Sequence, residues 1–416
     1  MSRRDVIVSV DLAGQVHRVG VLHLGSVRGR ETATFRYDDA WLEANDRFAL
    51  APALTLDAGG FQPLPSQSLH GAFSDSAPDR WGRMLMQRDE RRRARLEHRT
   101  PRALQESDYL LGVHDEARQG ALRFRLSAEG PFVAENRPGN IPPMLELPRL
   151  LAATQKLDSD ADAEADDALA LILAPGSSLG GARPKASVRA KNGALWIAKF
   201  AKSDDTYSME SWEAVALTLA KAAGIMTPAF ELRAVARTRA LLVKRFDRQG
   251  AVRVPYLSAM SMMNATDGEP RSYVEIAEAL RRNGARAKAD LAELWRRLVF
   301  TIAISNLDDH LRNHGFLYDG AAGWRLSPAF DLNPVPADVR PRVLSTSVEV
   351  DGDFAASFEL AMEAQSQFLL SRAEAQAIVA DVAKAVAGWR RAATRLKVGR
   401  AEIDRMASAF RNPLKR

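Results

Sequence analysis

The chain has 416 residues, enough to bury a large core and to form two or three domains. Its 58 Lys and Arg exceed its 52 Asp and Glu, and the net charge of +6 permits an acidic partner without requiring one. The absence of Cys excludes disulfides and thiolate chemistry. No apolar run approaches the ~18 residues of a membrane-spanning helix. The first residues lack the pattern of a signal peptide, so we expect a soluble, cytoplasmic protein without membrane contact.

Two different patterns occupy the first hundred residues. Residues 5–38 alternate apolar and polar side chains, and Gly14 and Gly25 interrupt the alternation. This pattern predicts a small antiparallel sheet. Residues 68–99 change character and lead into a basic run, 88–102, with seven Arg against three acids. A solvated helix with a charged surface explains this run, and contact with nucleic acid or a DNA-binding partner is the alternative.

A glycine-rich stretch, 175–185, predicts a loop. Its glycines would let the backbone approach phosphate oxygens, and its serines and lysine add donors or charge. The residues concerned are Gly176, Ser177, Ser178, Gly180, Gly181 and Lys185. The stretch matches neither the Walker pattern nor the glycine pattern of protein kinases, so a flexible connecting loop is the alternative.

The next elements carry a lysine and a glutamate of interest. Residues 186–200 predict a hairpin with its turn at Asn192–Gly193. Lys199 stands alone among apolar strand residues, where it can reach nucleotide phosphates or simply face outward. Glu213 follows 14 residues later, near the start of a helix predicted for 211–223. A Lys–Glu pair positions the phosphate-binding Lys in kinases, although Glu in a first turn also suits the helix dipole.

Further along, strands predicted at 232–235 and 240–246 precede a mainly helical region that begins near residue 291. The second strand ends in polar residues, as a hinge between lobes would, where backbone groups could pair with an adenine edge. A plain strand end followed by a turn is the alternative. Helices are also predicted at 366–388 and 400–410. A strand-rich half followed by a helix-rich half indicates an α+β protein.

The most informative spacing lies between Asp308 and Asn313, five residues apart after an apolar helix, with Asp331 closing the strand-like run 324–330. Phosphoryl-transfer enzymes use this spacing. One carboxylate takes the proton of a substrate hydroxyl, while the Asn and the later Asp hold Mg²⁺ on the nucleotide phosphates. The His-Arg pair that usually precedes the first Asp is replaced here by Asn306–Leu307.

Other uses of this polar cluster remain open at the level of sequence. Asn306 or Asp308 could cap a helix, and the histidines could be packed and hydrogen-bonded. A metal-dependent hydrolase could use Asp308, Asp309, His310 and His314. That reading would leave the upstream loop, lysine and glutamate unexplained.

Together these residues resemble the HipA family, the kinase toxins of bacterial type II toxin–antitoxin systems. The segment 71–82 is similar to the family's N-terminal subdomain, 178–185 to its phosphate-loop motif, 306–313 to its catalytic loop, and Phe330–Asp331 to its metal-binding motif. The match extends over nearly the whole chain. Leu307 stands where family members often have Thr, and Asp309 where they often have Gly.

The resemblance implies an α+β, two-lobed protein-kinase-like fold. Its N-terminal lobe is strand-rich and has an extra N-terminal subdomain, and its C-terminal lobe is helical. We expect the HipA-type subdomain over 1–125 and the rest of the N-terminal lobe, with the phosphate loop and ATP-binding strands, over 126–250. The C-terminal lobe with the catalytic loop would occupy 251–416.

The resemblance also implies a role for each candidate residue. Asp308 would be the catalytic base, and Asn313 and Asp331 would bind Mg²⁺. Lys199 would contact ATP phosphates, and Glu213 matches the helix Glu. The other residues implied at the nucleotide are Gly180, Gly181, Ala182, Lys244, Phe246 and His310. Ser178, or the adjacent Ser177, falls on the serine whose autophosphorylation ejects the loop and switches the kinase off.

The family's substrates and partners complete this expectation. Typical substrates are translation components such as aminoacyl-tRNA synthetases. The usual partner is HipB, a separately encoded helix-turn-helix antitoxin through which DNA is contacted. The segment 256–263, with Asp267–Gly268, suggests a distinct subfamily. A catalytically weak ATP-binding corepressor, which strengthens the antitoxin on DNA, is the alternative function.

Overall fold

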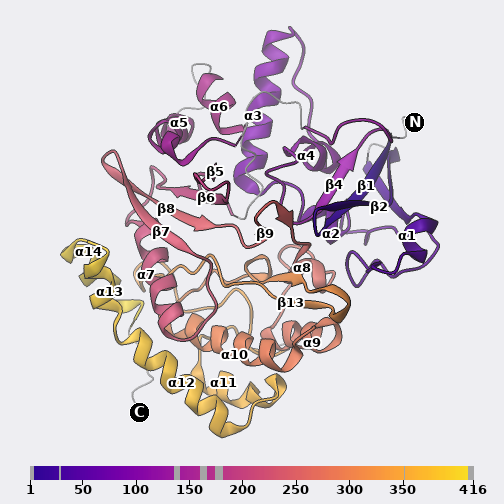
Figure 1. Ribbon diagram of the computed structural model, residues 1–416. Helices are drawn as coiled ribbons and strands as arrows, with labels where there is room; N and C mark the ends of the chain where they lie inside the picture. Colours follow the sequence, from indigo (N-terminus) through magenta and orange to yellow (C-terminus); the bar gives the residue numbers. More distant parts are fainter. Residues whose placement is uncertain are drawn as a thin grey trace. The chain divides into compact units, whose positions relative to one another are not determined.

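The protein is described by a computed structural model that covers residues 4–27, 30–134, 141–159, 166–173, 181–350 and 352–410 (Figure 1). Two compact units share these residues. The first unit consists of Met1–Asp204 and Ala234–Leu257, and the second of Asp205–Arg233 and Ser258–Arg416.

The N-terminal segment of the first unit forms the predicted antiparallel sheet, with the strand order β3-β2-β1-β4. The strands are β1 (Arg4–Leu12), β2 (Gln15–Val27), β3 (Arg30–Tyr37) and β4 (Leu122–Arg125). Val6, Val8 and Val10 on β1 are fully buried, because the alternation of the sequence sends every second side chain to one face. The helices between β3 and β4 are α1 (Asp39–Glu43), α2 (Gly71–Ser74), α3 (Arg80–Leu96) and α4 (Glu106–Gly112).

A second sheet has the strand order β5-β6-β8-β7. Its strands are β5 (Lys185–Arg189), β6 (Leu195–Phe200), β7 (Phe230–Val235) and β8 (Thr238–Lys244). The predicted hairpin is present: β5 and β6 are antiparallel, Gly193 adopts φ +82°, and the Asn192 side chain accepts from the Ala194 amide. A short ribbon follows, formed by β9 (Arg248–Gln249) and β10 (Val252–Arg253).

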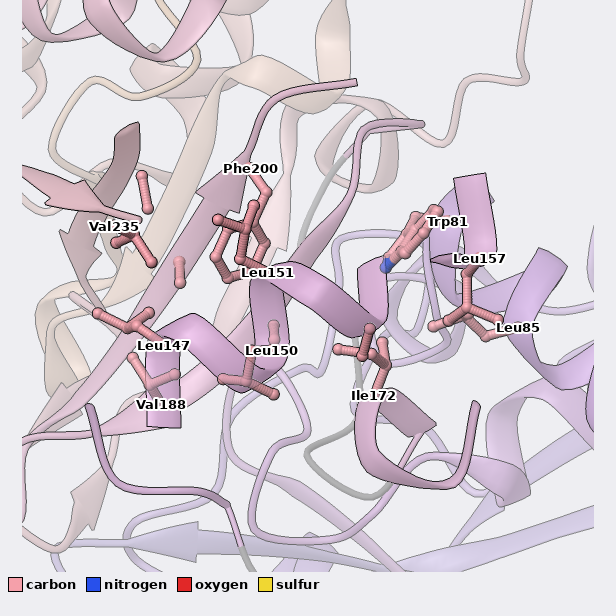
Figure 2. Packing of buried hydrophobic residues seen from close by; sticks show 14 of the residues in the cluster. Trp81, Leu85, Leu147, Leu150, Leu151, Leu157, Ile172, Val188, Phe200 and Val235 are labelled. Carbon is pink, nitrogen blue, oxygen red and sulfur yellow. The ribbon is translucent and has the colours of Figure 1, made fainter. Parts of the chain in front are cut away.

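Three helices pack against this second sheet and form the core of the region (Figure 2). They are α3, α5 (Leu147–Ser159), which follows the 3-10 turn Met144–Glu146, and α6 (Asp166–Leu173). The cluster joins Trp81 of α3, Leu150 of α5 and Ile172 of α6 to Val188 and Phe200 of the sheet. Helix α3 of the N-terminal segment therefore contributes to the core of the second sheet.

Most arginines of the basic run 88–102 already have a partner within the first unit. Asp89 pairs with two of them, Glu90 with two, and Asp166 with one, while a further one donates to a backbone carbonyl. The arginines concerned are Arg88, Arg92, Arg93, Arg95, Arg99 and Arg102. This pairing agrees with the charged surface helix, although two carboxylates are each shared by two arginines.

The second unit is mainly helical, as predicted. Its longer helices are α7 (Met209–Ala222), α9 (Tyr273–Asn283), α10 (Ala287–Ile304) and α12 (Arg372–Val386). The shorter ones are α8 (Ala259–Met262), α11 (Phe358–Glu363), α13 (Trp389–Arg395) and α14 (Arg400–Arg405). Its 3-10 turns are Leu311–Asn313, Gly320–Ala322, Ala364–Phe368 and Met406–Ser408. A small sheet has the order β11-β12-β13. Its strands β12 (Gly315–Tyr318) and β13 (Trp324–Leu326) belong to the second unit, and β11 (Tyr256–Ser258) is where the chain passes from the first unit to the second.

Helix α10 is the centre of the second unit and contacts α9, α11 and α12. Its C-terminal half, from Arg297 to Ile304, is buried on all sides, so the loop that follows it starts from a fixed point. Of the strand expected over 324–330, only β13 is present. The chain from residue 327 to Asp331 is not part of a strand. No helix in the described part of the chain is long and apolar enough to cross a membrane.

Candidate active site

The loop with the Asp–Asn spacing begins where α10 ends. Ser305 adopts a left-handed conformation (φ 53°) that terminates the helix, and its hydroxyl donates to the Ala409 carbonyl at 2.8 Å. Three residues later Asp308 reaches solvent, with 68% of its side chain exposed. A buried helix end thus presents an exposed carboxylate.

Backbone and side-chain hydrogen bonds fold this loop on itself. The Asp308 carbonyl accepts from the His310 amide at 3.0 Å and from Nδ2 of Asn313 at 3.0 Å. A carbonyl only accepts, so the amide group of Asn313 must turn its NH₂ inward, which leaves Oδ1 as a potential ligand for a cation. Nδ1 of His310 is buried, and none of the described residues gives it a hydrogen-bond partner. The expected base, metal ligand and nucleotide contact therefore lie within one short loop.

Asp331 lies on a segment that runs beside this loop. The Asn333 amide donates to Oδ1 of Asn306 at 3.1 Å, and the Val335 amide donates to the Ser305 carbonyl at 3.0 Å. Asp331 itself has φ 59°, a left-handed conformation that Asp and Asn tolerate better than most residues. A carboxylate and an amide oxygen on neighbouring segments suit Mg²⁺, which binds through few protein oxygens and completes its shell with water and phosphate.

Asp309 and His314 lie in the core of the second unit. Both are buried, with Nε2 of His314 3.3 Å from Oδ2 of Asp309, an ion-pair distance without hydrogen-bond geometry. Burial alone would raise the pKa of Asp309, but the charge of His314 and the hydrogen bonds of the site outweigh it and lower that pKa. Burial and the nearby Asp309 raise the pKa of Tyr273 well above its usual value. The residues of the hydrolase alternative are thus divided between the surface and the core.

The first unit holds Lys199 on β6, partly buried and directly opposite Lys185 of β5. Like charges in opposite positions destabilise a sheet unless one is offset. Asp79 provides that offset: its Oδ2 lies 2.8 Å from Nζ of Lys185, and both side chains are buried. Asp79 also caps α3, because its Oδ1 accepts from the Gly82 amide at 2.8 Å.

The same region contains the described end of the glycine-rich loop. Gly181 has φ +94°, and its carbonyl accepts from the Trp81 amide. Ala182 follows as an exposed residue. The predictions for Ser177, Ser178 and Gly180 lie outside the described residues.

The end of β8 combines an exposed lysine with buried charge. Lys244 is exposed and Phe246 is partly buried, 6.3 Å from the Tyr256 ring. Arg245 between them is buried and pairs with Asp247 at 2.6 Å. The polar strand end that suggested a hinge therefore also contains a buried ion pair.

Glu213 is buried on α7 of the second unit. The start of this helix is held by Glu402, whose Oε1 accepts from the Ser208 amide at 3.0 Å and from Nε1 of Trp212 at 2.7 Å. Trp212 is adjacent to Glu213, so the C-terminal segment fixes the part of α7 that carries the glutamate.

Sequence reasoning missed two residues that contact the site. Arg340 reaches Asp308 at 3.3 Å, and Asp79 reaches Lys185 from 106 positions away. Asp79 lies inside the segment 71–82 that carried the family resemblance, which was a usable signal. Arg340 had none, because nothing in its neighbourhood distinguishes it from other surface arginines.

Comparison with known proteins decides the family. The family model of the HipA-like C-terminal domain matches residues 177–389, more than half of the chain, and that of the HipA N-terminal domain matches residues 10–124. The chain belongs to the HipA family. The predicted α+β, kinase-like fold is confirmed.

Two relatives illustrate the similarity. HipA of Shewanella oneidensis MR-1, solved with HipB and its operator DNA, aligns over 97% of this chain and 95% of its own, with a TM-score of 0.67 and 16% identity. At that identity the likeness shows the fold alone. A protein of Sinorhizobium fredii named "Putative kinase Y4dM" is 36% identical over 97 residues. That match spans 23% of this chain and 23% of the relative.

Proposed function

We propose that this HipA-family protein is an ATP- and Mg²⁺-dependent serine/threonine protein kinase that acts as the toxin of a type II toxin–antitoxin module. The observation that carries the proposal is the loop 308–313. There, the bond from Nδ2 of Asn313 to the backbone carbonyl of Asp308 holds the two residues together, and the Asp308 carboxylate is exposed. Asp331 on the neighbouring segment supplies the second oxygen ligand of a kinase metal site.

The proposed mechanism relies on positioning and charge more than on covalent help. Asp308 orients the substrate hydroxyl and accepts its proton while the hydroxyl oxygen bonds to the γ-phosphorus. The bond from that phosphorus to the bridging oxygen breaks, and ADP leaves with the electron pair. Asn313 and Asp331 would hold Mg²⁺, which neutralises phosphate charge when it is bound.

The remaining candidate residues have supporting roles in this proposal. Lys199 adds a positive charge for the phosphates, and Glu213 is its expected helix partner. Backbone groups at Lys244 and Phe246 would take the adenine edge. Gly180, Gly181 and Ala182 would approach the phosphates, and the buried Nδ1 of His310 is a polar atom that a ligand could satisfy.

The proposed partner is a HipB-like helix-turn-helix antitoxin, through which the complex would contact DNA. The Shewanella protein was solved in complex with HipB and its operator DNA. The proposed substrate is a translation component such as an aminoacyl-tRNA synthetase, and autophosphorylation of Ser178 or Ser177 would switch the kinase off by adding charge to the phosphate loop.

The experiment that tests the proposal is an intact-mass measurement before and after incubation with Mg·ATP. The proteins are the wild type and the Asp308→Asn variant. We expect the wild type to gain about 80 Da per phosphate, mapped to Ser178 or Ser177, and the variant to gain none while still binding ATP.

A matched control separates the role of Asp308 from the loss of a surface ion pair. Asp404 is similarly exposed and lies 3.2 Å from Arg390, so Asp404→Asn removes an equivalent pair far along the chain. This control should gain phosphate like the wild type. An unmodified wild type that binds ATP but gains no phosphate would overturn the kinase proposal and favour the corepressor, for which salt-dependent DNA binding with the antitoxin is the next test.

A further inference from the structure

Asp309 is buried immediately beside the exposed base candidate. Asp308 has 68% of its side chain exposed, whereas Asp309 has 7%. A buried carboxylate is costly unless several donors surround it. Its presence next to Asp308 therefore needs a physical explanation.

The donors around Asp309 come from separate elements of the second unit. Oδ2 accepts from the hydroxyl of Tyr273 on α9 and, at 3.3 Å, from the hydroxyl of Thr301 on α10. His314, which immediately precedes β12, lies 3.3 Å away. The Asp309 backbone carbonyl accepts from the Thr346 hydroxyl at 2.7 Å. Both the side chain and the backbone of this residue are thus fixed to the core.

Asp309 lies in the chain between Asp308 and Asn313, which the proposed reaction needs in a constant relative position. On one side, the Asp308 carbonyl receives bonds from His310 and Asn313. On the other, the Tyr273 ring packs edge-on against His314 at 5.2 Å, which supports the chain just after Asn313. A glycine at position 309 could make none of the side-chain contacts and would leave more backbone conformations open.

We propose that Asp309 is a positioning residue: anchored by Tyr273, Thr301 and His314, it fixes the direction in which Asp308 points. This inference rests on the proposed kinase function. Asp309 does not touch the substrate or take a proton. It restricts the backbone conformations of the loop that carries Asp308. This restriction matters because misplacement of a reacting group by about 1 Å can cost on the order of 100-fold in rate.

The test compares Asp309→Ala, Asp309→Asn and Tyr273→Phe with the wild type, using kcat, the KM for ATP and the melting temperature. We expect Asp309→Ala to lower kcat roughly 10- to 100-fold while the KM for ATP changes less than about threefold. Asp309→Asn should lose less, because its amide oxygen still accepts from the Tyr273 and Thr301 hydroxyls. Tyr273→Phe should also lower kcat, since it removes the hydrogen bond from the Tyr273 hydroxyl to Asp309 while the aromatic ring remains.

A stability control distinguishes positioning from general loosening of the unit. Trp295 on α10 is buried and donates from Nε1 to the Ala361 carbonyl at 3.1 Å, so Trp295→Phe removes a buried hydrogen bond away from the loop. It should lower the melting temperature and leave kcat near the wild-type value below that temperature. If Asp309→Ala does not fold, kcat of Asp309→Asn and Tyr273→Phe is compared with that of the wild type instead.

The outcomes separate this inference from the function on which it rests. An active wild type with unchanged kcat in all three variants overturns the positioning role and leaves the kinase intact. Equal losses of kcat in the Trp295→Phe control also overturn it, because the effect is then structural. A wild type that transfers no phosphoryl group overturns both.

Discussion

Nη1 of Arg340 lies 3.3 Å from Oδ1 of Asp308, on the exposed surface of the second unit. An arginine therefore occupies one oxygen of the carboxylate that we propose as the base. An incoming hydroxyl must share that carboxylate with the guanidinium or displace it.

Replacing Arg340 with Gln should modestly raise the rate of phosphoryl transfer. Exposed ion pairs contribute about 1 kcal/mol or less, so we expect a gain of up to about fivefold at low salt. High salt should raise the wild-type rate and leave the variant unchanged, because screening weakens the same contact. Arg390→Gln, which breaks the pair with Asp404, is the control. A fall in rate for Arg340→Gln would show that the arginine orients the base.

The proposed metal ligand Asp331 can be tested without disturbing its unusual backbone. Asn also tolerates the left-handed φ of 59°, so Asp331→Asn removes the charge with little added strain. We expect kcat to fall by about 100-fold or more, because a metal ion contributes several kcal/mol of charge stabilisation. ATP affinity should lose most of its dependence on Mg²⁺ in titration calorimetry at several Mg²⁺ concentrations. Retained Mg²⁺-dependent binding would remove Asp331 from the metal site.

The buried pair of Asp79 and Lys185 should show strong coupling in unfolding experiments. Asp79→Asn keeps the cap of α3, since Asn also caps helices, but leaves the Lys185 charge buried and opposite Lys199. We expect a loss of about 3 kcal/mol or more in the free energy of unfolding.

The double variant Asp79→Asn/Lys185→Met should recover much of that loss, since no buried charge is then unpaired. Urea unfolding of both single variants and the double variant gives the coupling energy. Additive losses would mean that the two side chains are solvated and do not depend on each other.

Short-range patterns in the sequence were sufficient for much of the fold. Alternation along β1 and β2 and the Asn192–Gly193 turn are local signals, and the structure confirms both elements. The Asp308–Asn313 spacing is local too, and the structure places both residues in one loop, although their catalytic roles stay predictions. Each of these features is decided within about ten residues of chain.

Burial and distant partners were beyond the reach of those patterns. Asp309 and His314 had the same polar appearance as Asp308, and partners such as Tyr273, 36 residues earlier, distinguish the buried carboxylate of Asp309 from the exposed one of Asp308. The polar residues at the end of β8 suggested a hinge, yet Arg245 among them is buried and donates to the backbone carbonyls of Ala117 and Arg118. Long-range pairing of this kind leaves no periodicity for the sequence to show.

Asp247 should control the acid stability of the first unit. Its carboxylate accepts from Arg245 at 2.6 Å, from Arg248 at 2.8 Å and from the Gly120 amide at 2.8 Å. Burial would raise the pKa of Asp247, but the two arginines and these hydrogen bonds lower it well below its usual range. Below the unfolded-state pKa of about 3.9, Asp247 binds a proton in the unfolded chain but not in the folded unit. The contribution of Asp247 to the free energy of unfolding is therefore fully present above that pH and decreases as the pH falls through it.

Asp247→Asn should therefore lower stability at neutral pH by about 3–5 kcal/mol, because two buried arginines lose their counter-charge, and should flatten the decline between about pH 5 and pH 3. Urea unfolding at several pH values measures both effects. Asp204→Asn is the control, since the hydrogen bond from Lys202 lowers the pKa of Asp204 at an exposed position where solvent screens the pair. An Asp247→Asn variant that is as stable as this control at neutral pH would show that water, and not Asp247, balances the arginines.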